Sequence, residues 1–198
     1  MMDDLELRSR ILDRINAELL DSEVQKKAIY KEVRHESTLV ATLRLHLYAE
    51  KELNEILPVM VLHSESIVNQ VFKRKLSLLY SLGVMDKHLF DAISKLNDVR
   101  NNFAHKLEYE SSSDYYQDLK SGLSGWVLEN HKADVKMIEL SNGELDDDTK
   151  FRIAIAGIWI QLRIFATSIM LKKFEYAKRL EREIKEELDK ESTSTDEE

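Results

Sequence analysis

Cysteine is absent from this chain of 198 residues, and turn-forming residues are scarce, with one Pro and five Gly. The absence of cysteine excludes disulfide bonds and thiolate metal sites, and it fits a reducing cytoplasm. A chain with so little glycine and proline has little need for tight turns, which favours long helices over many short strands. The composition therefore predicts an all-α protein.

The sequence also shows no secretory signal peptide and no uninterrupted membrane span. The N-terminus, Met1-Met2-Asp3-Asp4, lacks the basic and then apolar order of a secretory signal peptide. Residues 153–171 are mostly apolar, but Arg152, Gln161 and Arg163 interrupt what would otherwise resemble a membrane span. We expect a cytoplasmic protein in which this stretch is a core helix or an oligomer interface, with no membrane association.

The charge balance argues against one class of partner. The net charge is −8, and half of it lies between Lys178 and Glu198. Domains that hold duplex DNA by bulk electrostatics are usually basic. No motif for sequence-specific DNA reading is present either, so duplex DNA is not an expected partner.

Common catalytic motifs are missing as well. The sequence has no Gly-rich phosphate loop, no H-E-x-x-H and no G-x-S-x-G. Asp146-Asp147-Asp148 could form a metal cluster, but three acidic residues directly before Thr149 are typical of a helix cap. We therefore predict no metal site and no cofactor.

The spacing of apolar residues predicts about six helices around one core. One domain is expected over residues 1–190, with 109–148 as an insertion or variable region and 191–198 as a disordered acidic tail. Residues 131–148 are ambiguous, since 135–140 have some strand character. The predicted helices cover 3–21, 22–33, 37–57 (ending near Pro58), 65–82 (ending at Gly83), 87–104 (capped by Asp86), 115–128 (short, and broken by Gly122 and Gly125), and a long last helix from Thr149.

The stretch from Leu96 to His105, L-N-D-V-R-N-N-F-A-H, carries the most informative chemistry. Arg100 and His105 are five residues apart, about 140° around an ideal helix, whereas Asn101 and His105 share a face. Arginine binds phosphate and histidine moves protons near neutral pH, a pairing suited to RNA cleavage without metal through the 2′-hydroxyl. The alternative is a capped, hydrogen-bonded helix end.

One histidine per chain does not easily act as both base and acid. A two-fold dimer would bring two copies of His105 and Arg100 into one cleft, so this chemistry predicts a homodimer. His46 and Glu50 share a helix face and are expected as a supporting polar pair in a helix groove rather than metal ligands. The remaining histidines, His35, His63, His88 and His131, are expected at the surface or in loops.

These residues resemble two related families. Arg100-Asn101-x-x-x-His105 resembles the R-N-x-x-x-H motif of the HEPN superfamily. The segment K-L-S-L-L-Y-S-L-G-V from Lys75 to Val84, followed by Arg100 to His105, resembles the mannitol operon repressor family. The resemblance covers about His46 to Leu107, roughly a third of the chain.

The HEPN resemblance implies an all-α, commonly dimeric protein, in many cases a metal-independent endoribonuclease of toxin–antitoxin or phage-defence systems. Arg100 would then bind the scissile phosphate, His105 would be the acid/base, and Asn101 would position them, with Glu50 joining from an earlier helix. HEPN toxins paired with nucleotidyltransferase antitoxins often carry a Tyr two residues after the His, where this chain has Leu107.

The mannitol operon repressor resemblance instead implies a non-catalytic transcriptional regulator that acts through a protein partner. The expected partners are therefore a second copy of the chain, RNA if the site is catalytic, and an antitoxin or regulatory protein. Basic residues that would hold the RNA backbone are Lys73, Arg74, Lys75 and Lys106, with Lys172 and Lys173 added if the patch converges.

Overall fold

A computed structural model describes residues 13, 17, 20, 21, 24–105 and 114–195, and within these it contains helices and no strand. The all-α prediction is confirmed. Residues 24–33 are helical. The helices that follow are α2 (Thr38–Met60), α3 (Glu65–Val68), α4 (Phe72–Ser81), α5 (Lys87–His105), α6 (Tyr115–Lys120), α7 (Gly125–Asn142) and α8 (Asp147–Thr195).

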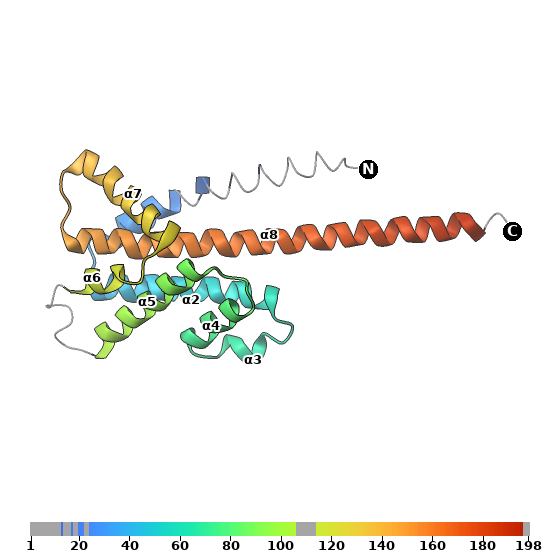
Figure 1. Ribbon diagram of the computed structural model, residues 1–198, viewed down its shortest axis with the longest axis horizontal. Helices are drawn as coiled ribbons and strands as arrows, with labels where there is room; N and C mark the ends of the chain where they lie inside the picture. The colour runs from blue at the N-terminus through green and yellow to red at the C-terminus, as the bar shows by residue number, and fades with distance from the viewer. Residues whose placement is uncertain (1–12, 14–16, 18–19, 22–23, 106–113, 196–198) are drawn as a thin grey trace.

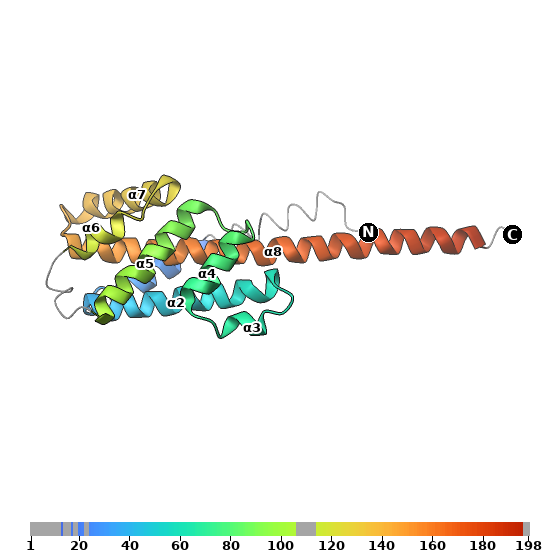
Figure 2. The ribbon, with the colours of Figure 1, turned by 60° about the horizontal axis from the view of Figure 1, so that its bottom comes forward.

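Helix α8, with 49 residues, is the longest helix of the molecule. Its C-terminal part extends well beyond the other helices in both views (Figures 1 and 2). At 1.5 Å per residue α8 is about 74 Å long. Helix α2 runs parallel to it. The Thr38 hydroxyl lies 2.6 Å from Asp148 at one end, and Lys173 donates to the Val59 carbonyl, at 3.0 Å, at the other. In Figure 1, α7 and residues 24–33 cover the opposite side of α8 from α2, α4, α5 and α6.

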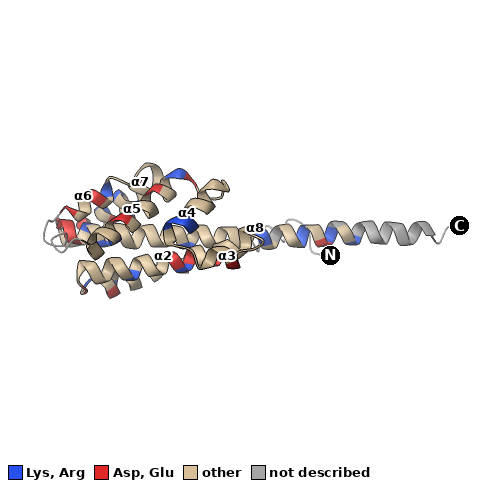
Figure 3. Cartoon of the chain, turned by 90° about the horizontal axis from the view of Figure 1, so that it is seen from below, with Lys and Arg blue, Asp and Glu red and all other residues tan. Residues whose placement is uncertain are grey.

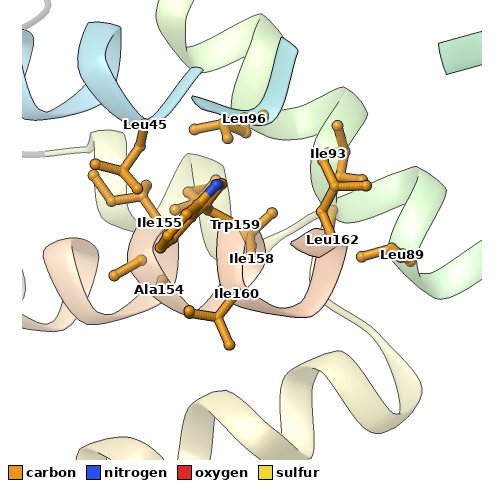
Figure 4. Packing of buried hydrophobic residues seen from close by; sticks show 14 of the residues in the cluster. Leu45, Leu89, Ile93, Leu96, Ala154, Ile155, Ile158, Trp159, Ile160 and Leu162 are labelled. Atoms are coloured by element: carbon orange, nitrogen blue, oxygen red, sulfur yellow. The ribbon is translucent and has the colours of Figure 1, made fainter. Parts of the chain in front are cut away.

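The core is built on the first half of α8, where every residue from 151 to 160 is buried. Ile155, Ile158 and Leu162 pack among Leu45 of α2 and apolar residues of α5 (Figure 4). Each such side chain contributes about 1.5–3 kcal/mol when it is fully buried. Of the two roles expected for residues 153–171, the core role therefore holds for 153–160.

In the described part of the chain, the segment Asp147–Arg182 is long and apolar enough to cross a membrane. Of its most apolar window, however, 61% is buried inside the molecule. That burial is what the core helix of a soluble protein shows. Between Lys172 and Lys185, most of the side chains that the structure describes are exposed, and many are charged.

A polar network fixes the first turn of α8. The buried guanidinium of Arg152 donates to Asp148 (2.8 Å), to the Val33 carbonyl (2.6 Å) and to the Thr38 hydroxyl (3.2 Å). The Tyr115 hydroxyl adds a bond to Asp148 at 3.1 Å. Burial alone would raise the pKa of Asp148, but these donors outweigh it and the pKa is lowered. The network ties residues 24–33, α2, α6 and α8 together at one point.

The predicted acidic cap is also present. The Thr149 N–H donates to the Asp146 carboxylate at 2.7 Å, just before the helix proper. No group of His, Asp and Glu residues in the described chain is arranged to hold a metal ion. The three acidic residues therefore start a helix.

Both ends of the link between α4 and α5 follow the prediction. Gly83 is in the left-handed region (φ 67°), and the Val84 N–H reaches back to the Leu79 carbonyl at 3.2 Å, which closes α4 as in a Schellman motif. The Asp86 carboxylate accepts from the His88 and Leu89 amides, at 2.8 and 3.3 Å, and caps α5.

Two predicted helix boundaries are wrong. Helix α2 continues through Pro58 to Met60, because a proline in the last turn costs only one intrahelical bond close to the end. The predicted helix over 65–82 is broken into α3 and α4. The Gln70 N–H closes a turn onto the Ile67 carbonyl (2.8 Å), and Val71 is extended, with φ −62° and ψ 147°. The break turns Phe72 inward, where it is buried.

The region after residue 114 differs more. Residues 135–140, which have strand character in sequence, lie inside α7. Val127 and His131 are the buried positions of that helix and are four residues apart, so packing selects the helical period over β propensity. Helix α8 continues to Thr195, past residue 191 where the tail was expected to begin. Residues 3–12, 14–16 and 18–19 of the first predicted helix, residues 22–23 of the second, and residues 196–198 lie outside the described residues.

We predict that Arg152→Met destabilises the protein by about 3 kcal/mol, because it leaves the Val33 carbonyl and Asp148 without their charged donor. Urea unfolding followed by circular dichroism measures the change. Lys87→Met is the matched control, since the pair between Lys87 and Asp91 lies on the exposed first turn of α5. Equal effects from the two variants would contradict a central role for the Arg152 network.

Candidate functional site

The site begins with one face of α5. Asn97, Arg100 and Asn101 are spaced three and four residues apart, so they share a face of the helix. Asn97 is buried, while Arg100 and Asn101 are half-buried. The Arg100 guanidinium donates to the Asn101 side-chain oxygen at 3.2 Å, and its Nε is buried with no partner among the described residues. The guanidinium therefore keeps one donor that no described residue accepts.

Helix α2 supplies a buried histidine to the same place. His46 Nε2 lies 3.1 Å from the Asn97 side-chain oxygen, and with that oxygen accepting, the ring proton is on Nε2. The ring packs on Phe72 of α4, with centroids 4.2 Å apart. Burial lowers the pKa of His46 and nearby Arg100 lowers it further, against the opposing effects of Asn97 and Glu50. His46 is therefore a neutral, fixed support at neutral pH.

The third pair joins α2 to α4. Lys75 is 2% exposed, and its ammonium lies 2.8 Å from the Glu50 carboxylate. The prediction that Lys75 binds the RNA backbone is therefore wrong, because a buried lysine that is committed to a carboxylate has no face for a phosphate. Glu50 was expected to form a supporting polar pair with His46, and its observed partner is Lys75.

His105 lies at the opposite edge of this arrangement. It is the last residue of α5 and is exposed. Because α5 is α-helical throughout from Arg100 to His105, the two side chains leave the helix about 140° apart. One chain therefore brings Arg100, Asn101, His46 and Asn97 together but leaves His105 on another face.

The remaining basic residues are only partly available. Lys73 and Arg74 are exposed on α4, where Arg74 donates to Gln70 at 3.3 Å. Lys172 and Lys173 are exposed on α8, and Lys106 lies outside the described residues. In Figure 3, basic and acidic residues are interspersed along the described helices.

Asn97 is the site residue that the motif did not identify. Its spacing to Arg100 and Asn101 was readable from sequence, but its partner His46 is 51 residues away, on another helix. The buried face of α2 also includes polar residues. Thr42 and His46 are buried there, while Leu47 is 62% exposed. The helical period alone did not indicate which stripe faces inward.

No family model, curated protein or solved structure matches this chain. The HEPN and mannitol operon repressor resemblances therefore stay predictions from the motif. A function for the site has to be argued from its own geometry.

The buried bond between His46 and Asn97 predicts strong coupling. Asn97→Ala should cost about 1–3 kcal/mol of stability, because it leaves the His46 N–H buried without an acceptor. In a double-mutant cycle with His46→Ala, we expect a coupling energy of about 0.5–3 kcal/mol from urea unfolding. Asn130→Ala, at an exposed position on α7, is the control. Additive losses from the two single substitutions would contradict the bond.

Proposed function

We propose that this protein is a metal-independent, HEPN-like endoribonuclease of the toxin or phage-defence kind, acting in the cytoplasm as a homodimer. One observation carries the proposal. The half-buried Arg100 guanidinium is held by Asn101 and keeps one donor without a partner among the described residues, while His105 is exposed five residues later on the same helix.

The proposed roles follow from the chemistry of each group. Arg100 binds the scissile phosphate and stabilises the charge that develops on it. His105 transfers protons to and from the RNA hydroxyls. Asn101 holds the guanidinium in place. His46 bonds Asn97 of α5 and Glu50 bonds Lys75 of α4, so both fix the helices around Arg100. The exposed Lys73 and Arg74 contact the RNA backbone.

The dimer is a requirement of this mechanism. His105 and Arg100 point to different faces of one continuous helix, so His105 of one chain serves Arg100 of a second chain. The two-fold arrangement forms two such sites, each with Arg100 of one chain and His105 of the other. No metal enters the proposed reaction, because the RNA 2′-hydroxyl is the nucleophile.

A second candidate function is a non-catalytic transcriptional regulator of the mannitol operon repressor kind, bound to a protein partner. This candidate is favoured by a different observation, the apolar side chains on the outer part of α8. Phe174, Leu180 and Ile184 are 56%, 44% and 49% exposed there. A partner protein, an antitoxin included, could cover such residues.

Purified protein is expected to cleave single-stranded RNA in excess EDTA. We predict that His105→Ala and Arg100→Ala each lower the cleavage rate on the order of a hundredfold or more, the usual range for general acid–base and phosphate-stabilising groups. Cleavage is measured on a fluorescent RNA, with circular dichroism to confirm the fold.

His35→Ala, at an exposed turn before α2, is the matched control and should cleave as the wild type does. If His105→Ala cleaves normally, or if no RNA is cut, the ribonuclease proposal fails. In the second case, recovery of a stable complex with a cellular protein, unaffected by Arg100→Ala, would favour the regulator.

A further inference from the structure

A polar cleft of about 320 Å³ opens between α6, α7 and the start of α8, on a part of the chain that the proposed ribonuclease does not use. It lies within residues 109–148 and the first turn of α8, the region expected from sequence to be variable. Its lining combines two buried aromatic or imidazole groups with a rim of lysines. The lining residues used below are Tyr116, Lys120, His131, Lys132, Lys136, Glu139, Asp147 and Lys150.

The inner wall holds a buried pair. His131 and Tyr116 are 6% and 5% exposed, and the Tyr116 hydroxyl lies 3.0 Å from His131 Nε2. His131 was expected at the surface or in a loop, so this placement corrects the prediction. His131 Nδ1 is buried and has no hydrogen-bond partner among the described residues. Buried polar atoms in folded proteins are nearly always satisfied, so this ring nitrogen calls for a partner.

The ring is neutral in the folded protein. Burial lowers the pKa of His131 to about 4, and the nearby charges of Lys120 and Lys26 act in the same direction. When the Tyr116 hydroxyl donates to Nε2, the single ring proton is on Nδ1. The unsatisfied atom is then a donor, and an anionic oxygen is the acceptor that would complete it.

The rim supplies positive charge. Four lysines and two carboxylates line the cleft, a formal excess of two positive charges in a protein whose net charge is −8. Lys150 lies 3.6 Å from Glu139, and Lys132 lies 2.8 Å from Glu129. Lys136 makes no ion pair with a described residue, and the Lys120 ammonium stands 5.7 Å from the Tyr116 ring centroid. Lys120 and Lys136 are therefore the cations available to a ligand.

We propose that this cleft binds a small molecule through a phosphate monoester group, with His131, Lys120 and Lys136 as the donors. A phosphate dianion matches the formal charge of the lining, and its several oxygens accept from donors on different sides, which one carboxylate does less well. The volume is at the lower end of the range for small-molecule sites, so it suits a mononucleotide-sized ligand.

The test uses the full chain and defined probes at constant ionic strength. Isothermal titration calorimetry with inorganic phosphate and with adenosine monophosphate is expected to show saturable binding. In nitrogen-15 spectra, the His131 imidazole signals should shift as each ligand is added, with the same saturation. Lys120→Ala combined with Lys136→Ala should weaken binding on the order of tenfold or more.

Lys178→Ala with Lys185→Ala removes the same charge from the exposed end of α8 and should leave binding unchanged. Lys120 and Lys136 are exposed, so their removal leaves the core intact. Acetate that binds as tightly as phosphate would overturn the phosphate assignment. Phosphate binding that survives loss of Lys120 and Lys136, or no binding at all, would overturn the site. None of these outcomes depends on whether the protein cleaves RNA.

Discussion

The parallel packing of α2 on α8 is the constraint on which the rest of the structure depends. Arg152 and Asp148 fix one end of this pair through Thr38, and Arg163 contacts the buried Glu52 at 3.4 Å further along. Between these points the apolar side chains of α8 fill the core. These polar contacts set the register of the two helices. The buried face of α2 accordingly includes the polar residues Thr38, Thr42, His46 and Glu52 beside its apolar residues. Loss of the register would move His46 away from α5.

The candidate site follows from that register. His46 and Glu50 leave α2 one turn apart and meet α5 and α4 through Asn97 and Lys75. Both polar pairs are partly or wholly removed from water, where an unpaired member would be costly, so each pair fixes the position of its helix. Arg100 and Asn101 share the face of α5 that Asn97 anchors. Asn101 holds the guanidinium on a helix whose position is fixed by α2, whereas His105 at the helix end is exposed. The arrangement is a preorganised half of a site.

Sequence alone was sufficient where one residue type dictates local geometry. Gly83 stops α4, Asp86 caps α5 and Asp146 caps α8, as their positions indicated. Prediction from sequence failed where contacts between distant parts of the chain determine the local structure or the partner of a side chain. Residues 135–140 have strand propensity but lie in α7, and Lys75 looks like part of a basic patch until Glu50 is placed beside it. In the site, the i, i+4 spacing of His46 and Glu50 indicated a shared face, but their partners on α4 and α5 required the fold. His131 is the same case, because its burial depends on α6.

The central claim is that two chains complete one site, and subunit mixing tests it directly. Arg100→Ala and His105→Ala proteins are each assayed for RNA cleavage in EDTA, then unfolded together, refolded and assayed again. A site that pairs Arg100 of one chain with His105 of the other regains one intact site in each mixed dimer, about a quarter of wild-type activity with random pairing. A site contained within one chain has no intact copy in any mixed dimer. Recovery of cleavage on mixing is the result predicted here, and a mixture as inactive as its two components would contradict the composite site.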